Sequence, residues 1–230
     1  MRKDLRLSDE DKQRFAEEQA LGMVAPEADV LNRVAICVSE AEIGTPAVKK
    51  IVAKLFTAAG GQIEAGRADA EKGHTRRLVG LAAPQIGVSR RIIVVDTKVT
   101  PERKGESRLE CLINPEIVWR SRETTPGREG CFSAGPVWGT VRRPVAVKVR
   151  ALTPEGKVIE QIFEDFTARI VQHEIDHLDG VRFPERIRSD RHRHWVHAEE
   201  LFDYAKRSEG WPHIVTRAEW DSFKHGELLY

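Results

Sequence analysis

The sequence has few cysteines, no long apolar run and no excess of charge of either sign. Three cysteines in 230 residues cannot form a disulfide framework for a chain of this length, and an odd number is typical of a reducing compartment. No stretch approaches the roughly 18 apolar residues of a membrane-spanning helix. Lys and Arg number 37 against 36 Asp and Glu, so the net charge of +1 argues against a strongly basic nucleic-acid-binding protein.

The N-terminal residues also lack the features of a targeting segment. Met1–Arg6 runs directly into the acidic stretch Ser8–Asp11, so the apolar core of a secretory signal and the acid-poor composition of a transit peptide are both missing. Hydrophobic residues make up 40% of the chain and charged residues 32%, which is enough for an apolar core under a charged surface. We therefore expect a globular, cytoplasmic protein with no membrane segment.

Residue spacing predicts the order of helices and strands. A capping pattern at Ser8 begins a charged helix over residues 8–20, and Thr45-Pro46 begins a second helix that Gly60-Gly61 is expected to end. The polar residues 62–77 show no clear period and are interpreted as an inserted loop. Five strand-like runs follow, at residues 78–83, 91–96, 111–120, 144–152 and 157–163.

Helical spacing returns over residues 165–178, and Gly180 is placed to end that helix. Strands and helices do not alternate regularly along the chain, so the expected fold class is α+β. We expect antiparallel or mixed strands to pack around this central helix.

The central helix carries His173-Glu174-Ile175-Asp176-His177, an H-E-x-x-H pattern. Residues four apart share one face of a helix, so the two imidazoles can bind one cation with Glu174 beside it. In zinc hydrolases the glutamate of this pattern moves the proton of the attacking water. The alternative is a structural helix whose two histidines are satisfied by hydrogen bonds.

A catalytic metal normally has three protein ligands, so this pattern needs one more. Zincins take the third ligand downstream, where His192, His194 and His197 lie among arginines whose charge disfavours a second cation. Cys131 lies upstream, in a polar and glycine-flanked segment where a buried core thiol is not expected. One thiolate and two imidazoles would leave the fourth tetrahedral position for water.

A third segment, Gly80-Leu81-Ala82-Ala83-Pro84-Gln85, combines small residues with one neutral amide donor. Small residues let another backbone approach closely, and Gln85 projects a carboxamide. Read alone, the segment also fits an ordinary strand end followed by a turn.

Taken together, these three segments resemble the peptide deformylase family. Its motif Gly-x-Gly-h-Ala-Ala-x-Gln, where h is hydrophobic, is matched by Leu78–Gln85. Its Glu-Gly-Cys-h-Ser motif is matched by Glu129–Ser133, and its Gln-His-Glu-h-Asp-His-Leu motif by Gln172–Leu178. The sequence departs from the family at Leu78, where the first motif glycine is expected, and at Phe132, where leucine is usual.

The similarity extends over about residues 45–187. The resemblance implies a deformylase-like catalytic domain at 45–187, between an N-terminal helical extension at 1–44 and a C-terminal extension at 188–230. It implies a peptide-deformylase-like α+β fold whose central helix carries the H-E-x-x-H pattern.

The resemblance also implies one divalent metal ion, held by Cys131, His173 and His177. Fe(II) is the metal expected in the cell, and Zn(II), Ni(II) or Co(II) fit the same donors. Glu174 would act as the general acid and base.

Two groups would stabilise the oxyanion, namely the side-chain amide of Gln85 and the backbone N–H of Phe132. The residues that would bind the substrate peptide, as walls of a methionine pocket or as sites of close backbone approach, are Val79, Gly80, Gly130, Phe166 and Ile170.

The implied reaction is removal of the N-formyl group from the N-terminal formyl-methionine of newly made polypeptides, with release of formate. The implied partners are therefore N-formyl-methionyl nascent peptides. The segment 186–194 carries four arginines against one aspartate, which suggests a transient contact with ribosomal RNA, although a solvated helix face gives the same pattern. Two alternatives stay open, a catalytically silent relative that binds formyl peptides or ribosomes, and an H-E-x-x-H metallopeptidase.

Overall fold

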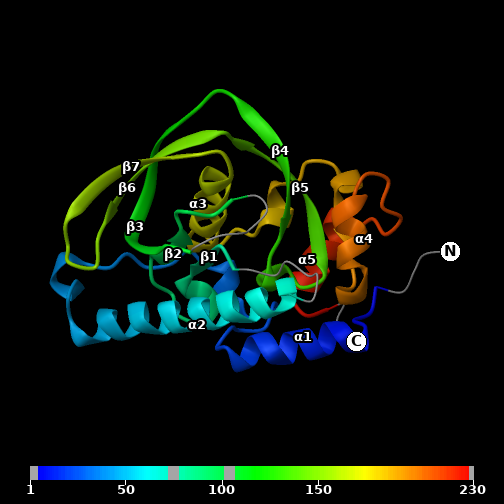
Figure 1. The fold of residues 1–230 in the computed structure, drawn as a ribbon, viewed down its shortest axis with the longest axis horizontal. Coiled ribbons are helices and arrows are strands. Elements are labelled where there is room, and N and C mark those ends of the chain that lie inside the picture. Colours follow the sequence, from blue (N-terminus) through cyan, green and yellow to red (C-terminus); the bar gives the residue numbers. More distant parts are fainter. Residues whose placement is uncertain (1–4, 72–77, 101–106, 228–230) are drawn as a thin grey trace.

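The computed structural model describes residues 5–71, 78–100 and 107–227. Within these ranges the α-helices are α1 Asp9–Ala20, α2 Pro46–Glu71, α3 Asp165–Leu178, α4 Leu201–Lys206 and α5 Arg217–Lys224 (Figure 1). Short 3-10 helices lie at Asp29–Asn32, Glu40–Glu42, Ala83–Ile86, Phe132–Ala134, Phe183–Arg186, Asp190–His192 and Ala198–Glu200. None of the described helices combines the length and the apolar character that crossing a membrane requires.

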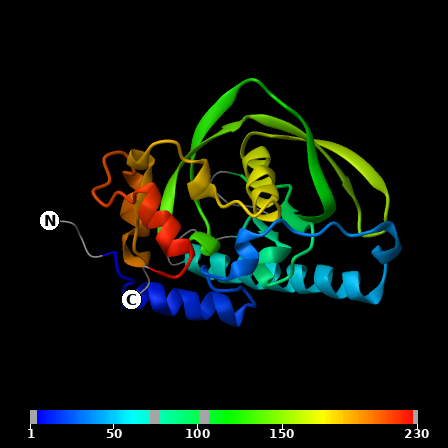
Figure 2. The same ribbon diagram turned by 180° about the vertical axis from the view of Figure 1, so that it is seen from behind.

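The described strands form two antiparallel sheets. The first has the order β1-β2-β3-β6-β7, with β1 Gly80–Ala82, β2 Ile92–Asp96, β3 Leu109–Arg120, β6 Ala146–Leu152 and β7 Val158–Glu164. The second has the order β4-β5-β8, with β4 Thr124–Gly130, β5 Val137–Pro144 and β8 Arg193–Trp195. Helix α3 lies between the curved sheets in both views (Figures 1 and 2), so the predicted α+β fold around a central helix is confirmed.

The β1–β2 end of the five-stranded sheet is buried on both faces, as β2 illustrates. Ile93 packs in one apolar cluster with Val171 of α3. Its neighbour Ile92 packs in a second cluster with Leu55 of α2. Successive side chains of a strand point to opposite faces, so this continuously apolar strand contributes to both cores. Helix α3 is thereby fixed against a rigid surface.

Helix α2 continues through Gly60-Gly61, where the sequence predicted its end, and reaches Glu71. The loop expected at 62–77 is therefore wrong for residues 62–71, while 72–77 lie outside the described residues. An internal glycine costs a helix only about 1 kcal/mol relative to alanine. The earlier turns are already held by packing of Leu55, and the following residues are rich in alanine, glutamate and glutamine, which favour continuation.

Several local predictions agree with the structure. Ser8 caps α1, accepting from the backbone N–H of Asp11 while the Asp11 carboxylate accepts from that of Ser8. Gly180 follows α3 with a φ of +69°, and Gly156 has a φ of +81° in the β6–β7 hairpin. The strand expected at 78–83 is shorter than predicted, since β1 spans Gly80–Ala82. Strand β4 was not predicted because Thr124–Gly130 has no alternating apolar pattern.

Both ends of the chain meet in what we call the terminal region, residues 5–32 and 190–227. Figures 1 and 2 show α1 beside α4 and α5 at one end of the molecule. The Asp11 carboxylate is 1% exposed, accepts from the backbone N–H of Ala198 at 2.9 Å and lies 2.7 Å from Nδ1 of His197. Trp195 and Trp220 are buried in the apolar core of this region. The two chain ends are therefore fastened to each other by a buried polar contact and an aromatic core.

Candidate metal centre

Helix α3 places two histidines and a glutamate in a buried position. His173 and His177 lie one turn apart, and their ring centroids are 5.0 Å from each other. Glu174, on the same turn, is 3% exposed. The apolar residues of α3 pack against the five-stranded sheet, which orients the opposite side of the helix toward β4.

Cys131 comes from the other side of the centre, where β4 ends and the short helix Phe132–Ala134 begins. Its Sγ lies 3.4 Å from Nε2 of His177. One ligand atom from each of Cys131, His173 and His177 lies within 4.8 Å of the other two. Tetrahedral ligands at typical Zn–N and Zn–S distances stand about 3.5 Å apart, so the set matches one cation with small adjustments.

The two imidazoles have different surroundings. Nδ1 of His173 lies 3.0 Å from Oε2 of Glu129, a carboxylate contact typical of metal-ligating histidines. Burial opposes charge on His173, but contacts with Cys131 and Glu129 outweigh it and raise its pKa. Burial, together with the charges of His173 and Arg182, lowers the pKa of His177. Nδ1 of His177 is buried with no hydrogen-bond partner among the described residues, while its Nε2 faces Cys131.

Glu129 is the centre of a buried charge network that the sequence indicated only in part. Arg143 donates to it through Nε at 2.7 Å and Nη2 at 2.8 Å, and Arg169 donates through Nη1 at 2.8 Å. Burial would raise the pKa of Glu129, but Arg143 dominates and holds it well below its usual range. Arg143 also donates to Asp176 at 2.9 Å, so the same guanidinium joins Glu129 of β4 to α3.

Glu174 has the surroundings of a proton-transfer group. Its Oε2 is buried with no hydrogen-bond partner among the described residues. Burial, opposed by the nearby His173, raises its pKa to about 7. A Cβ at position 80 would lie 2.5 Å from Oε1 of Glu174, so only glycine at 80 leaves this carboxylate its place.

Gln85 lies beside the predicted thiolate. Its Oε1 accepts from the backbone N–H of Ala82 at 2.8 Å, which fixes the amide orientation. Its Nε2 donates to Oγ of Ser133 at 3.2 Å and to Sγ of Cys131 at 3.4 Å. The structure thus brings Gln85 and Cys131 together, although 46 residues separate them in the chain. Phe132 packs its ring into the apolar cluster under α2, which leaves only its backbone to face the centre.

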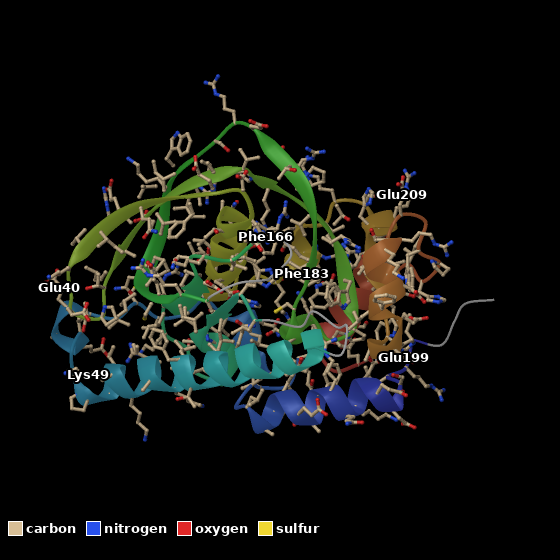
Figure 3. All side chains as sticks on the ribbon, viewed as in Figure 1. Glu40, Lys49, Phe166, Phe183, Glu199 and Glu209 are labelled. Carbon is tan, nitrogen blue, oxygen red and sulfur yellow. The ribbon has the colours of Figure 1, made fainter. Side chains whose placement is uncertain are left out.

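The predicted substrate residues fall into two groups. Val79, Phe166 and Ile170 share one apolar cluster beside α3, and Figure 3 places Phe166 on α3 between the sheets. Gly80 faces Glu174 and Ile170, as described above. Gly130 differs, because a Cβ there would lie 2.4 Å from the Trp138 ring.

One aromatic contact was not anticipated from the sequence. Phe183, labelled in Figure 3, stacks on the imidazole of His173 with ring centroids 5.9 Å apart. Phe183 follows α3 in a short apolar turn, a pattern typical of ordinary core residues, so no signal distinguished it.

Two of the three downstream histidines are occupied elsewhere, and the third, His192, is exposed. Nδ1 of His194 lies 2.9 Å from the hydroxyl of Tyr204, and its Nε2 lies 2.8 Å from the carbonyl of Arg191. His197 is engaged by Asp11 in the terminal region. The arrangement therefore favours Cys131 over these histidines as the third ligand.

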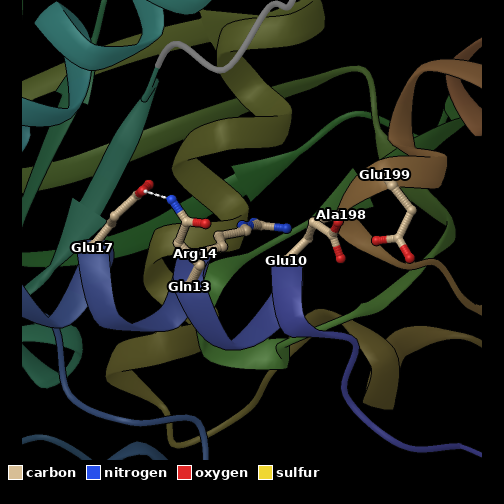
Figure 4. Close-up of a pocket in the computed structure, with 6 residues that line it drawn as sticks. All are labelled: Glu10, Gln13, Arg14, Glu17, Ala198 and Glu199. Atoms are coloured by element: carbon tan, nitrogen blue, oxygen red, sulfur yellow. Dashed lines mark hydrogen bonds between the residues drawn. The ribbon is translucent and has the colours of Figure 1, made fainter.

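A surface depression of about 220 Å³ lies apart from this centre (Figure 4). It is lined by Glu10, Gln13, Arg14, Glu17, Ala198 and Glu199. Gln13 donates to Glu17 across one turn of α1, as the dashed line in Figure 4 marks. The lining contains none of the residues of the metal centre, so we assign the depression to the surface of the terminal region.

Fold and site together define a candidate metal-dependent hydrolase. A profile of the family described as polypeptide deformylase matches residues 20–193. The peptide deformylase of Desulforudis audaxviator is 50% identical over 108 residues, which are 47% of this chain and 66% of that protein. That of Caldanaerobacter subterraneus is 50% identical over 109 residues, covering 47% of this chain and 63% of the relative. The aligned part thus spans just under two thirds of these relatives.

Solved structures extend the likeness. The class I type b peptide deformylase of Acinetobacter baumannii superimposes with a TM-score of 0.60 at 35% identity, covering 72% of this chain and 98% of that one. The enzyme of Thermotoga maritima gives a TM-score of 0.56 at 29% identity, covering 73% and 97%. This chain belongs to the polypeptide deformylase family.

Proposed function

We propose that this chain removes the N-formyl group from the formyl-methionine at the start of newly made polypeptides and releases formate. The observation that carries the proposal is the convergence of Cys131, His173 and His177 within 4.8 Å beside the buried carboxylate of Glu174. A relative from Acinetobacter baumannii has been solved with the tripeptide Met-Ala-Ser bound. Such a tripeptide is what removal of the formyl group would leave.

Cys131, His173 and His177 would hold the divalent cation. The thiolate and imidazole donors suit Fe(II), Zn(II), Co(II) or Ni(II), and we propose Fe(II) in the cell. A cation held there supplies Lewis-acid chemistry, polarising a carbonyl oxygen and making water more acidic. Elemental analysis of anaerobically purified protein tests the metal, since a predominance of zinc would contradict the iron assignment.

Glu174 would move the proton. Its unpartnered Oε2 can take a proton from the attacking water and later deliver it to the nitrogen of the leaving amine. A carboxyl with a pKa raised to about 7 accepts and releases protons near neutral pH. Charge develops on the formyl oxygen at the same time, and Nε2 of Gln85 and the backbone N–H of Phe132 would donate to that oxygen.

Substrate binding would use the apolar cluster beside α3. Val79, Phe166 and Ile170 offer an apolar wall for the methionine side chain. Gly80 would lie where the peptide backbone passes close to Glu174. Gly130 would lie at a second close approach of the peptide backbone, at the end of β4. A Cβ at position 130 would collide with the Trp138 ring, so this glycine would also let β4 and β5 pair closely.

The same proposal places residues 45–187 as the catalytic unit, residues 1–44 and 188–230 as extensions, and the protein in the cytoplasm with nascent peptides as partners. A transient ribosome contact would involve the exposed Arg188 and Arg191, because Arg193 is 1% exposed and the guanidinium of Arg186, although exposed, donates to Asp176. Sedimentation with ribosomes at low and high salt tests this contact. Binding that survives Arg188→Glu combined with Arg191→Glu would contradict it.

The decisive experiment is formate release from formyl-Met-Ala-Ser, with acetyl-Met-Ala-Ser as the matched control. A deformylase releases formate from the first peptide and leaves the acetyl peptide intact. Cleavage of an internal peptide bond without formate would identify a metallopeptidase instead. Binding of the formyl peptide without turnover, in metal-loaded protein, would identify a silent relative.

A further inference from the structure

Arg182 lies just beyond α3 and buries its side chain beside the loop of Cys131. The residue is 1% exposed. Its Nη1 donates to the carbonyl of Pro26 at 2.6 Å and to the carbonyl of Ser133 at 2.7 Å. Its Nη2 donates to Oδ1 of Asn32 at 2.7 Å. One guanidinium therefore joins three segments that are far apart in the chain.

Burying the charge of Arg182 costs free energy that a residue needed only for packing would not cost. The guanidinium donates to three backbone carbonyls and one side-chain amide. Among the described residues, none of its hydrogen-bond acceptors is a carboxylate. Burial accordingly lowers the pKa of Arg182 to about 10. Arg143, also buried, bonds instead to the carboxylates of Glu129 and Asp176. An apolar side chain would occupy the place of Arg182 without a buried charge, so packing alone does not account for an arginine there.

On one side, Arg182 is held by the terminal region. Pro26 and Asn32 belong to its N-terminal part, and the carbonyl of Lys224, at the end of α5, accepts from Nη2 at 3.4 Å. The guanidinium carbon lies 4.9 Å from the centre of the Trp220 ring, a distance typical of a cation–π contact. Both ends of the chain thus fix the direction of this side chain.

On the other side, Arg182 reaches the metal centre through Ser133. Ser133 is fully buried and lies two residues after Cys131. Its carbonyl accepts from Arg182, while its hydroxyl accepts from Nε2 of Gln85, the amide that also contacts Sγ of Cys131. A shift of Ser133 would therefore move the thiolate and the oxyanion donor together.

We propose that Arg182 is a positioning residue, which uses the terminal region as an anchor to hold Ser133, and through it Cys131 and Gln85, in working geometry. The inference rests on the proposed function and extends it: both chain ends, although outside the proposed catalytic unit, contribute to turnover. Arg182 touches no reacting atom in this account. Misplacement of a catalytic group by a fraction of an ångström to one ångström is enough to reduce rates strongly.

The test replaces Arg182 by methionine, which keeps the length and removes the hydrogen bonds. Arg193→Met is the matched control, because Arg193 is also 1% exposed and donates to the carbonyls of Pro184, Ile187 and Val215. Its one carboxylate partner is Asp190, and none of these residues lies in the Cys131 loop. Each protein is loaded with Co(II) to equal content. The readouts are kcat and KM for formyl-Met-Ala-Ser, the thiolate-to-Co(II) absorption band and the melting temperature.

We expect Arg182→Met to lower kcat roughly ten- to a hundredfold with a smaller change in KM, and to shift the Co(II) band. Arg193→Met should lower the melting temperature but keep the band and stay within about twofold of the wild-type kcat. Arg182→Lys should lie between wild type and Arg182→Met, because an ammonium can bond to Ser133 but cannot bridge three segments. Equal losses of kcat in the two methionine variants, or an unshifted band in Arg182→Met, would overturn the proposal.

The proposal can still be tested if Arg182→Met does not fold or if the wild type releases no formate. If Arg182→Met does not fold, Arg182→Lys and Asn32→Ala carry the test, since Asn32→Ala removes one anchor and leaves Arg182 in place. Wild-type kcat and an unshifted Co(II) band in both would contradict the positioning role. If wild type itself releases no formate, the deformylase assignment fails, while the Co(II) band still reports whether Arg182 positions Cys131.

Discussion

The metal centre and the terminal region both bury arginine side chains, but they balance the charge in different ways. In the metal centre, Arg143 and Arg169 bond to the carboxylate of Glu129. Beside the terminal region, the guanidinium of Arg182 bonds to carbonyl and amide oxygens. That of Arg193 bonds to three backbone carbonyls and to one carboxylate, that of Asp190 at 2.7 Å. Charges that meet opposite charges form a compact network around one site, whereas carbonyl partners can be drawn from any part of the chain.

The two regions have different roles: the metal centre carries the predicted catalytic residues, and the terminal region holds the two chain ends together. Glu129 accepts hydrogen bonds from two arginines and contacts His173, so every member of that network lies within one or two contacts of a predicted ligand. The terminal region contributes no predicted ligand, and its buried contact between Asp11 and His197 joins the two chain ends. Substitutions in the first region should therefore affect metal binding and turnover. Those in the second should affect stability first, except at Arg182, which also contacts Ser133 beside Cys131.

The largest effects are expected at the metal ligands. Cys131→Ser, His173→Ala and His177→Ala should each lose most of the bound metal and reduce formate release to background, because two protein ligands hold a cation poorly. Elemental analysis and the formate assay on the same preparations check both losses. Full metal occupancy in Cys131→Ser would contradict its assignment as the third ligand.

Substitution of Glu174 should reduce turnover without reducing metal binding. Glu174→Gln should keep the metal and lose about 10²- to 10⁴-fold in kcat, the range that general acid–base catalysis contributes. The carboxamide is nearly the same size as the carboxyl, so the coordination sphere is undisturbed. Measuring kcat at matched metal content gives the result, and near-normal turnover would exclude the acid–base role.

In the terminal region, Asp11→Asn should lower the free energy of unfolding by about 1.5 to 3 kcal/mol, because the buried carboxylate accepts a hydrogen bond from the N–H of Ala198 and faces Nδ1 of His197. Metal content should remain as in wild type. Asp9→Asn is the matched control on the same helix, since the Asp9 side chain is 96% exposed. Urea unfolding followed by tryptophan fluorescence measures the difference. Equal effects of the two substitutions would show that the buried contact does not fasten the chain ends.

The same comparison explains what could be predicted from the sequence. The predicted ligands Cys131, His173 and His177 lie in short motifs whose spacing is visible, and the structure brings their side chains together where α3 faces the end of β4. Helix α3 and strand β2 were predicted within a residue or so, since strong periodic patterns agree with their packing.

The partners of Arg182 and the contact between Asp11 and His197 could not be predicted. Carbonyl groups occur at every residue, and no local pattern shows which of them will face a given guanidinium. Likewise, 186 residues separate Asp11 from His197. The end of α2 was mispredicted for a local reason, because two glycines were weighed without the packing that already held the helix.

In the metal-free protein, we expect the buried Glu174 to make the free energy of unfolding depend on pH, an effect smaller than those above. Its pKa is raised from 4.5 to about 7, so the folded protein keeps a proton that the unfolded chain has released. The contribution of this carboxyl group to the free energy of unfolding is complete below pH 4.5 and is lost as the pH rises through 7. Relative to Glu174→Gln, the metal-free protein should lose about 2 kcal/mol between pH 5 and pH 8. Urea unfolding at both pH values checks this, and a pH-independent difference would mean that Glu174 titrates normally.

The smallest effect is expected at Leu78, where the family motif has glycine. Leu78 packs with the cluster under α2, whereas Val79 packs beside α3, so the leucyl side chain points away from the metal centre. Positive φ among the described non-glycine residues occurs only at Asn114 and Asp165, so the backbone at 78 does not require glycine.

Leu78→Gly should therefore change kcat/KM by less than about tenfold, or roughly 1.4 kcal/mol of transition-state binding. The side chain it removes contacts the α2 cluster, so stability should fall more than activity does. Formate release by wild type and variant on formyl-Met-Ala-Ser, at matched metal content, measures the first effect, and urea unfolding measures the second. A metal-loaded wild type that is inactive, and that Leu78→Gly switches on, would contradict the proposed enzyme and favour a silent binding protein. That result would mean that the backbone at position 78, and not the metal centre, decides whether a bound formyl peptide reacts.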